Sequence, residues 1–173
     1  MKNQGFTLLE LMIVIAVLSI IALYAVPGMG TLMRNNQLTT AKNALVASLQ
    51  MARAESATTG RNVVLCPSSN GRQCQTVGDW SQGWLIYRDD NLNGRFDPVE
   101  SLVLTHTQAA GTLTIRTSDG RRKLTYRGYG RADGSNVRFV FCDAGLSTGG
   151  QVVVANSGRI RSTDRVQFGD CGA

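Results

Sequence analysis

One carboxylate, that of Glu10, stands alone among apolar residues near the start of the chain. It is the only charged residue of Phe6–Val26, a segment of 21 residues. As an α-helix this segment would be about 32 Å long, which just spans the hydrocarbon core of a membrane. An unpaired carboxylate in that setting costs several kcal/mol, so it normally marks a functional site. Lys2 would stay on the cytoplasmic side, which puts the rest of the chain outside.

Four cysteines are the next residues whose type allows chemistry: Cys66, Cys74, Cys142 and Cys171. An even number outside the apolar segment is typical of disulfides formed in an oxidising compartment, with reduced core cysteines as the alternative. Four cysteines allow three pairings. We favour Cys66–Cys74, which would close a turn, and Cys142–Cys171, which would fasten the C-terminal tail to a strand. Zinc is disfavoured because no C-x-x-C occurs and the chain has one histidine.

A loop in the middle of the chain matches the calcium-binding pattern D-x-[DN]-x-[DN]-G-x5-E. Its possible ligands are Asp89, Asn91, Asn93, Asp97 and Glu100. The residues on either side are typical of strands rather than helices, and Asn-Gly is itself a hairpin-turn signal. We therefore favour a plain hairpin loop, keep calcium as the alternative, and expect no other cofactor.

Two further motifs could suggest catalysis or ligand binding. Gly145–Gly149 matches the nucleophile pattern G-x-S-x-G around Ser147. A turn between strands is favoured instead, because a nucleophile elbow needs a following helix and His106 is the sole candidate base. Trp80 and Trp84 could stack on a ligand, but their spacing favours packing in the core.

Basic residues gather toward the C-terminus. The formal net charge is +6, with eight Lys/Arg against seven Asp/Glu up to residue 105 and ten against five after it. A basic surface of this kind would attract polyanions. Coding bias is the alternative explanation, because 15 of the 18 basic residues are arginine.

The string Gly158-Arg-Ile-Arg gives this basic region its most definite geometry. If the segment is extended, Arg159 and Arg161 lie on one side, and Ile160 docks into the domain from the other. Two outward guanidinium groups can each hold a pair of phosphate oxygens, although a solvated tail without a ligand is the alternative. Arg165 follows in the same tail. A second cluster adds to the surface on charge alone: Arg121, Arg122 and Lys123.

Pro27, Gly28 and Gly30 interrupt the helical pattern after the apolar segment and predict a bend. Residues 27–60 then continue as an amphipathic helix, because apolar and small residues recur at i, i+3 and i+4. This stripe consists of Leu38, Ala41, Leu45, Ser48, Leu49 and Ala52. Gly60 is a suitable terminator.

After residue 61 the period changes to short runs typical of β-strands, separated by turn residues. The predicted strands are Asn62–Cys66, Trp84–Arg88, Leu102–Thr105, Thr112–Arg116, Leu124–Arg127, Val137–Cys142 and Val152–Ala155. Such strands can bury the helix stripe, so residues 61–173 are predicted as one β-rich domain with a basic tail. The fold class is α+β, with a long N-terminal helix packed on an antiparallel β domain.

The first residues, Met-Lys-Asn-Gln-Gly-Phe-Thr-Leu-Leu-Glu, resemble the type IV prepilin leader Gly-Phe-Thr-Leu-x-Glu. The resemblance implies that residues 1–5 are a leader, that a prepilin peptidase cuts between Gly5 and Phe6, and that the new N-terminus is methylated. Glu10 could then neutralise the amine of a neighbouring subunit in a filament core of low dielectric. A secretory signal peptide is the competing interpretation, but Ala22-Leu-Tyr-Ala fits its cleavage site poorly.

Further strings sharpen this resemblance: Cys66-Pro-Ser-Ser, Asp79-Trp-Ser-Gln-Gly-Trp, Asp89-Asp-Asn-Leu-Asn-Gly and the late Gly158-Arg-Ile-Arg. Over nearly the whole chain they are similar to the GspH/FimT family, which contains minor pilins of type IV pili and minor pseudopilins of type II secretion. The resemblance implies a type IV pilin-like fold. The Gly-Arg-x-Arg string also resembles the tail of FimT proteins, which bind DNA in natural transformation. It implies Arg159 and Arg161 as DNA contacts, with Gly158 giving the turn.

We therefore expect a minor pilin, not an enzyme, that binds double-stranded DNA through phosphates during DNA uptake. The alternative is a structural subunit without DNA binding, which primes a type IV pilus or belongs to a type II secretion pseudopilus. The expected partners are other pilins, the prepilin peptidase, double-stranded DNA and the inner membrane. The expected location is a single pass through the inner membrane with a periplasmic domain, and the pilus after assembly.

Overall fold

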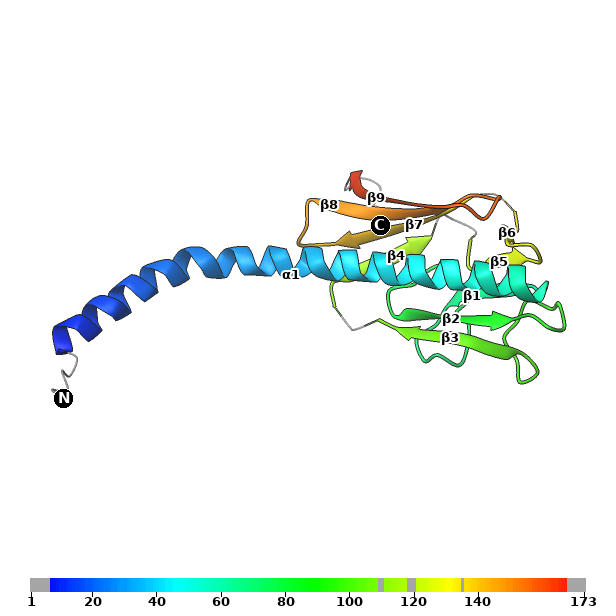
Figure 1. Cartoon of the computed structure of the whole chain (residues 1–173), viewed down its shortest axis with the longest axis horizontal. Helices are drawn as coiled ribbons and strands as arrows, with labels where there is room; N and C mark the ends of the chain where they lie inside the picture. The colour runs from blue at the N-terminus through cyan, green and yellow to red at the C-terminus, as the bar shows by residue number, and fades with distance from the viewer. Residues whose placement is uncertain (1–6, 109–110, 118–120, 135, 168–173) are drawn as a thin grey trace.

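In a computed structural model, residues 7–108, 111–117, 121–134 and 136–167 are described. Helix α1 spans Leu8–Thr59 and runs along two β-sheets with its first part protruding (Figure 1). It begins after Thr7, whose hydroxyl accepts a hydrogen bond from the Glu10 N–H at 3.2 Å. It ends at Gly60, which has a φ of 68° and donates its N–H to the Ser56 carbonyl. The predicted terminator is therefore confirmed.

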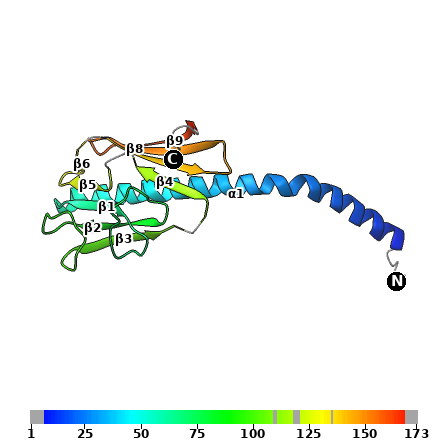
Figure 2. The same ribbon diagram turned by 180° about the vertical axis from the view of Figure 1, so that it is seen from behind.

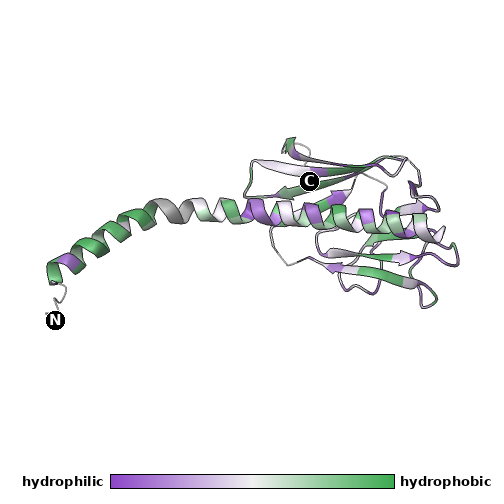
Figure 3. Ribbon diagram, viewed as in Figure 1, coloured by the Kyte–Doolittle hydropathy of each residue, from purple (hydrophilic) through white to green (hydrophobic). Residues whose placement is uncertain are grey.

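The axis of α1 bends by 46° between Leu23 and Gly28, where the sequence predicts a bend. The part before the bend is apolar and projects away from the domain (Figure 3). Among the described residues, no straight helix combines the length and apolar character of a membrane span. The bent pair Leu8–Leu23 and Gly28–Thr59 meets that condition only when its two parts are taken together.

In the described part of the chain, nine strands form two antiparallel sheets beside the helix. The first sheet has the order β3-β2-β1-β5-β6. Its strands are Ser101–Thr107, Gly83–Arg88, Val63–Pro67, Leu124–Arg127 and Arg131–Ala132 in that order. The second sheet has the order β4-β7-β8-β9. Its strands are Leu113–Thr117, Val137–Asp143, Thr148–Val154 and Ile160–Gln167. All seven predicted strands are confirmed within a few residues, whereas β6 and β9 were not predicted.

The C-terminal part of α1 packs on both sheets, as the view from behind also shows (Figure 2). The predicted helix stripe is buried throughout. In β1 the residues alternate between the two sides of the sheet. Val63 and Leu65 join the core under the helix, whereas Val64 and Cys66 face the opposite side of the sheet. One polar stripe residue, Ser48, accepts a hydrogen bond from the indole of Trp84 at 2.9 Å. The helix and the two sheets thus share one hydrophobic core.

Candidate nucleic-acid interface

The turn at Gly158 joins β8 to β9 and sets the direction of the tail. Gly158 donates its N–H to the Ala155 carbonyl at 2.8 Å, and Ala155 donates to the Arg159 carbonyl at 2.9 Å. The φ of Gly158 is 79°, in the left-handed region. A Cβ here would lie 2.1 Å from the carbonyl oxygen of Gly130. Both the backbone angle and the contact with a neighbouring turn therefore require glycine.

At the start of β9, one arginine precedes and one follows an isoleucine that packs inward, and both arginines are exposed. Ile160 packs against the core, whereas Arg159 and Arg161 are exposed. The alternation expected for an extended segment is therefore present. Arg165 lies in β9, but its side chain is outside the described part of the structure.

Two further arginines lie on the same side of the second sheet as Arg161. They were not predicted from the sequence, because only the strand register places them there. Arg138 of β7 lies opposite Val153 of β8, which in turn lies opposite Arg161 of β9. Opposite residues of antiparallel strands point to the same face, so Arg138 and Arg161 project together, about 10 Å apart across two strand spacings. Arg116 of β4 lies opposite Val140, two residues beyond Arg138, and belongs to this face too.

We use the name arginine face for four exposed residues: Arg116, Arg138 and Arg161 on one side of the second sheet, and Arg159 in the turn that precedes β9. No ion pair or hydrogen bond of their guanidinium groups is found within the part of the chain that the structure describes. Arg127 of the first sheet differs, because it pairs with Asp133 at 2.7 Å. The charge of the arginine face is therefore available to an external anion.

A hollow of about 550 Å³ lies beside Arg159. Its lining combines α1 residues, the Tyr129 turn and the start of β9: Gln50, Arg53, Ala54, Ala57, Tyr129, Arg159 and Ile160. The sequence analysis missed Arg53 and Tyr129. The one available signal for Tyr129 is its position between two glycines.

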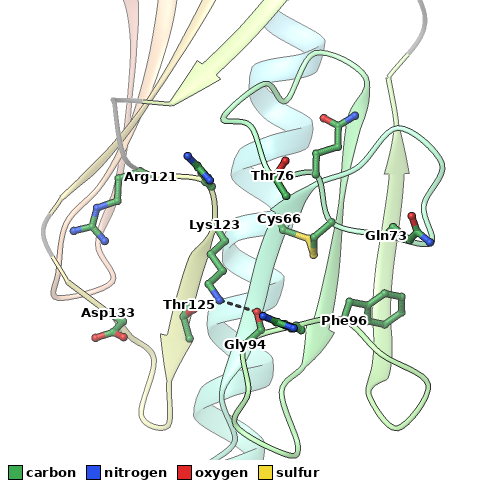
Figure 4. A pocket seen from close by; sticks show the side chains of 13 residues that line it. Cys66, Gln73, Thr76, Gly94, Phe96, Arg121, Lys123, Thr125 and Asp133 are labelled. Atoms are coloured by element: carbon green, nitrogen blue, oxygen red, sulfur yellow. Dashed lines mark hydrogen bonds between the residues drawn. A yellow bond between two sulfur atoms is a disulfide. The ribbon is translucent and has the colours of Figure 1, made fainter.

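The second predicted basic cluster lines a different groove, of about 820 Å³. This groove lies on the side of the first sheet that carries Cys66, away from the helix. Figure 4 shows Arg121 and Lys123 pointing in different directions, and the Lys123 ammonium donates to the Gly94 carbonyl at 2.7 Å. Arg122 is exposed. No member of the arginine face lines this groove, so the predicted basic residues divide between two separate surfaces.

The loop with the calcium pattern joins β2 to β3, which pair as a hairpin. Its polar groups largely bond one another. The Asp89 carboxylate accepts from the Gly94 N–H at 3.1 Å, and the Asp97 carboxylate accepts from the amides of Asn91 and Asn93 at 3.1 and 2.9 Å. The Asn93 hydrogen bond is the main cause that lowers the pKa of Asp97.

Within the described residues, no group of three acidic, histidine or cysteine side chains converges to hold a metal ion. Calcium binding by this loop stays the untested alternative to the favoured hairpin. A melting temperature that rises with calcium and falls again with EDTA would support it.

The predicted disulfide Cys66–Cys74 is present, with a Cα–Cα distance of 5.5 Å. Cys142 is buried on β7, and its predicted partner Cys171 lies outside the described residues. None of the described cysteines is free. The first disulfide borders the 820 Å³ groove, where it fixes the loop that follows β1.

The remaining motifs have structural roles. Trp80 and Trp84 are fully buried, and Trp84 stacks on His106 at a ring distance of 4.2 Å. Both tryptophans are thus core residues, and His106 on the edge strand covers one of them. Ser147 lies in the connection between the antiparallel strands β7 and β8, so its surroundings are not those of a nucleophile elbow.

The predicted cleavage residues Gly5 and Phe6 lie outside the described residues. Glu10 lies in the first turn of α1, among apolar side chains that are exposed from Leu8 (77%) to Leu23 (74%). An apolar surface of this extent needs lipid or other proteins to cover it. Glu10 would be covered together with its neighbours.

An N-terminal leader pattern, a long helix with an exposed apolar half and an antiparallel β domain together define a pilin-like protein. Residues 1–26 match the prokaryotic N-terminal methylation motif. Residues 41–158 match the family described as type II transport protein GspH, and the chain belongs to this family. It is therefore a minor type IV pilin or pseudopilin, a structural protein and not an enzyme.

Known relatives agree with this assignment. The pilin-like protein PilA1 of Thermus thermophilus is 30% identical over 124 residues, which cover 72% of each chain. The type IV minor pilin FimU of Pseudomonas aeruginosa has a similar fold, with a TM-score of 0.61 and 23% identity over 76% of this chain and 92% of that one. The minor pseudopilin EpsH of the Vibrio cholerae type 2 secretion system is similar at a TM-score of 0.53, with 11% identity over 74% and 97% of the two chains.

Proposed function

We propose that the chain is a minor type IV pilin that binds double-stranded DNA through its arginine face and acts in DNA uptake. The observation that carries this proposal is the set of four exposed guanidinium groups without acidic partners among the described residues, on the second sheet and its tail. Guanidinium groups hold phosphate oxygens through two parallel hydrogen bonds. The likeness of the Gly158-Arg-Ile-Arg string to the tail of FimT proteins supports the same role.

Binding of this kind should be nearly independent of base sequence. The arginine face lies on β-strands and a tight turn, and phosphate contacts position a protein on DNA without reading its bases. Each contact releases condensed counterions, so the affinity should fall steeply with salt. The separation of Arg138 and Arg161, about 10 Å, would let them reach different phosphates of one backbone.

The test is a titration of a labelled duplex with the full chain in detergent micelles, at several salt concentrations. The variant Arg159→Gln/Arg161→Gln should bind more weakly and flatten the plot of log K against log salt by roughly 0.9 per lost phosphate contact. Arg72→Gln is a matched control, because Arg72 is exposed but lies in the loop closed by the first disulfide. A double variant that keeps the wild-type affinity and slope would refute DNA binding by the tail.

We also propose the route by which the protein reaches its place. A prepilin peptidase would cut between Gly5 and Phe6, and the apolar half of α1 would hold the protein in the inner membrane with the domain in the periplasm. Other pilins would then cover the exposed segment from Leu8 to Leu23 during assembly into a pilus. The positive charge of Lys2 supports this orientation.

A second candidate function is a purely structural subunit, which primes a pilus or belongs to a secretion pseudopilus. The fold shared with a minor pilin and a minor pseudopilin favours it, since both architectures accommodate the chain. Loss of piliation or secretion with changes at Glu10, but no phenotype with changes at Arg159, would support this function over DNA uptake.

A further inference from the structure

The side chain of Tyr129 is exposed and has no packing role in the fold. Its side chain is 90% exposed, so the ring adds almost nothing to the core. Its φ is 75°, a backbone angle that is unfavourable for residues other than glycine. Residues held in such conformations without a packing role concentrate at functional sites.

The surroundings of Tyr129 suit a flat ligand that carries negative charge. The hollow beside the ring receives Arg53 from α1 and Arg159 from the turn before β9. The Nε of Arg53 donates to the Gly130 carbonyl at 3.2 Å, which orients its guanidinium group. The apolar part of the lining comes from Ala54, Ala57 and Ile160.

Tyr129 and Arg159 belong to two turns that pack directly against each other. Gly158 leaves room for the Gly130 carbonyl, which a Cβ would meet at 2.1 Å. Beside this contact, the Ala132 N–H donates to the carbonyl of Asn156 at 3.1 Å. The spacing between the backbones of Tyr129 and Arg159 is therefore set by the contact of the two turns, before any ligand binds.

We propose that this hollow binds one unpaired nucleobase of DNA, which stacks on Tyr129 while Arg53 and Arg159 contact the adjoining phosphate. The inference rests on the proposed DNA binding and extends it to single strands and frayed ends. Phosphate contacts alone make no use of an aromatic ring. The bases of an intact duplex are stacked inside it, whereas those of a single strand can stack on aromatic side chains.

The experiment compares three labelled probes of equal charge, with the full chain in detergent micelles. They are an oligothymidine strand, an abasic strand with the same sugar–phosphate backbone, and a duplex with closed ends. We expect the oligothymidine strand to bind on the order of tenfold more tightly than the abasic strand, because only the former can stack.

Tyr129→Ala should abolish the preference for oligothymidine over the abasic strand and leave duplex binding unchanged, whereas Tyr129→Phe should keep both. Leu92→Ala is the matched control. Leu92 is also an exposed apolar side chain (71%) with a positive φ of 62°, and it lies in the distant loop between β2 and β3. This control should bind all three probes like the wild type.

Three results would overturn the proposal of a base site, and each has a different consequence for the proposed function. If Tyr129→Ala keeps the preference while Arg159→Gln/Arg161→Gln loses duplex binding, the hollow has no base site but the proposed function stands. If the wild-type chain binds none of the probes, the proposed function fails together with the base site. If Tyr129→Ala keeps the preference but loses association with other pilins, the hollow is a protein interface.

Discussion

At the scale of the residue, Gly158 determines how the tail arginines are presented. Alanine at this position would have to adopt a φ near 79°, which costs about 1–2 kcal/mol. Its Cβ would also press on the Gly130 carbonyl, and overpacking of this kind costs about 1–3 kcal/mol more. We therefore expect Gly158→Ala to lower the free energy of unfolding by the sum of both effects and to weaken DNA binding. Thermal unfolding and the duplex titration measure these two results.

Gly60→Ala separates the two costs in this prediction. Gly60 has a similar φ of 68°, but nothing lies within 4 Å of the position that its Cβ would take. Only the backbone cost, about 1–2 kcal/mol, should appear in this control. Equal destabilisation by the two variants would mean that the Gly130 contact does not constrain the turn.

The sequence makes Arg159 and Arg161 candidates for the proposed site, because they alternate with an apolar residue in a string that resembles the FimT tail. It cannot identify Arg138 or Arg116, which join them only through the strand order β4-β7-β8-β9. Tyr129 was not predicted as a site residue for a different reason. Aromatic residues usually lie in cores, and two flanking glycines are too weak a signal to predict that this one is 90% exposed.

At the scale of the element, periodicity predicts the helix and the strands that are apolar on at least one face. It misses β6, which has two residues, and β9, whose alternation is broken by a charge. Asp164 of β9 forms an ion pair with Lys42 of α1, a lysine whose side chain is only 5% exposed. An ion pair thus replaces the apolar contact that would have marked β9 as a strand. The two partners are too far apart in sequence for the pair to be foreseen.

A second ion pair, between Arg34 of α1 and Asp143 of β7 in the same sheet, should make stability depend on pH. Burial of Asp143 acts to raise its pKa, but hydrogen bonds from Thr112 at 2.6 Å, Gly145 at 2.8 Å and Arg34 at 2.9 Å outweigh it. The pKa therefore lies below its ordinary value of 3.8. Because the folded state favours the ionised carboxylate, its contribution is fully present above about pH 4 and is lost as the pH falls through the lowered pKa.

Asp143→Asn should therefore lower the free energy of unfolding at pH 7 by about 1–3 kcal/mol. The difference from the wild type should shrink as the pH is lowered below about 4. Thermal unfolding across this range measures both effects. Asp133→Asn is the control, since Asp133 and its partner Arg127 are largely exposed and such exposed pairs contribute little to stability. A gap for Asp143→Asn that does not shrink at all between about pH 4 and about pH 2 would show that its carboxylate is not the source of the stability.

At the scale of the whole molecule, the two halves of α1 face different environments. The second half is part of the core of the β domain, whereas the first half projects from it with apolar side chains exposed on all sides (Figure 3). A helix that is apolar all round is stable only within lipid or among other helices. The domain therefore carries the proposed binding surfaces, and the projecting half carries the capacity for assembly.

A change at Glu10 can test whether the projecting half mediates assembly, because Glu10 is the one charged residue on that half up to the bend. In a filament its carboxylate would meet the N-terminal amine of a neighbouring subunit at low dielectric, and breaking such a pair costs about 3–5 kcal/mol. Glu10→Val should therefore remain in the membrane fraction but fall at least about tenfold in sheared filaments, measured by immunoblotting of both fractions. Ser19→Ala, a polar-to-apolar change in the same segment, should assemble normally. Wild-type amounts of Glu10→Val in filaments would show that the carboxylate has no role in assembly. A mature chain that still begins at Met1 would lack the N-terminal amine at Phe6 with which the Glu10 carboxylate is expected to pair.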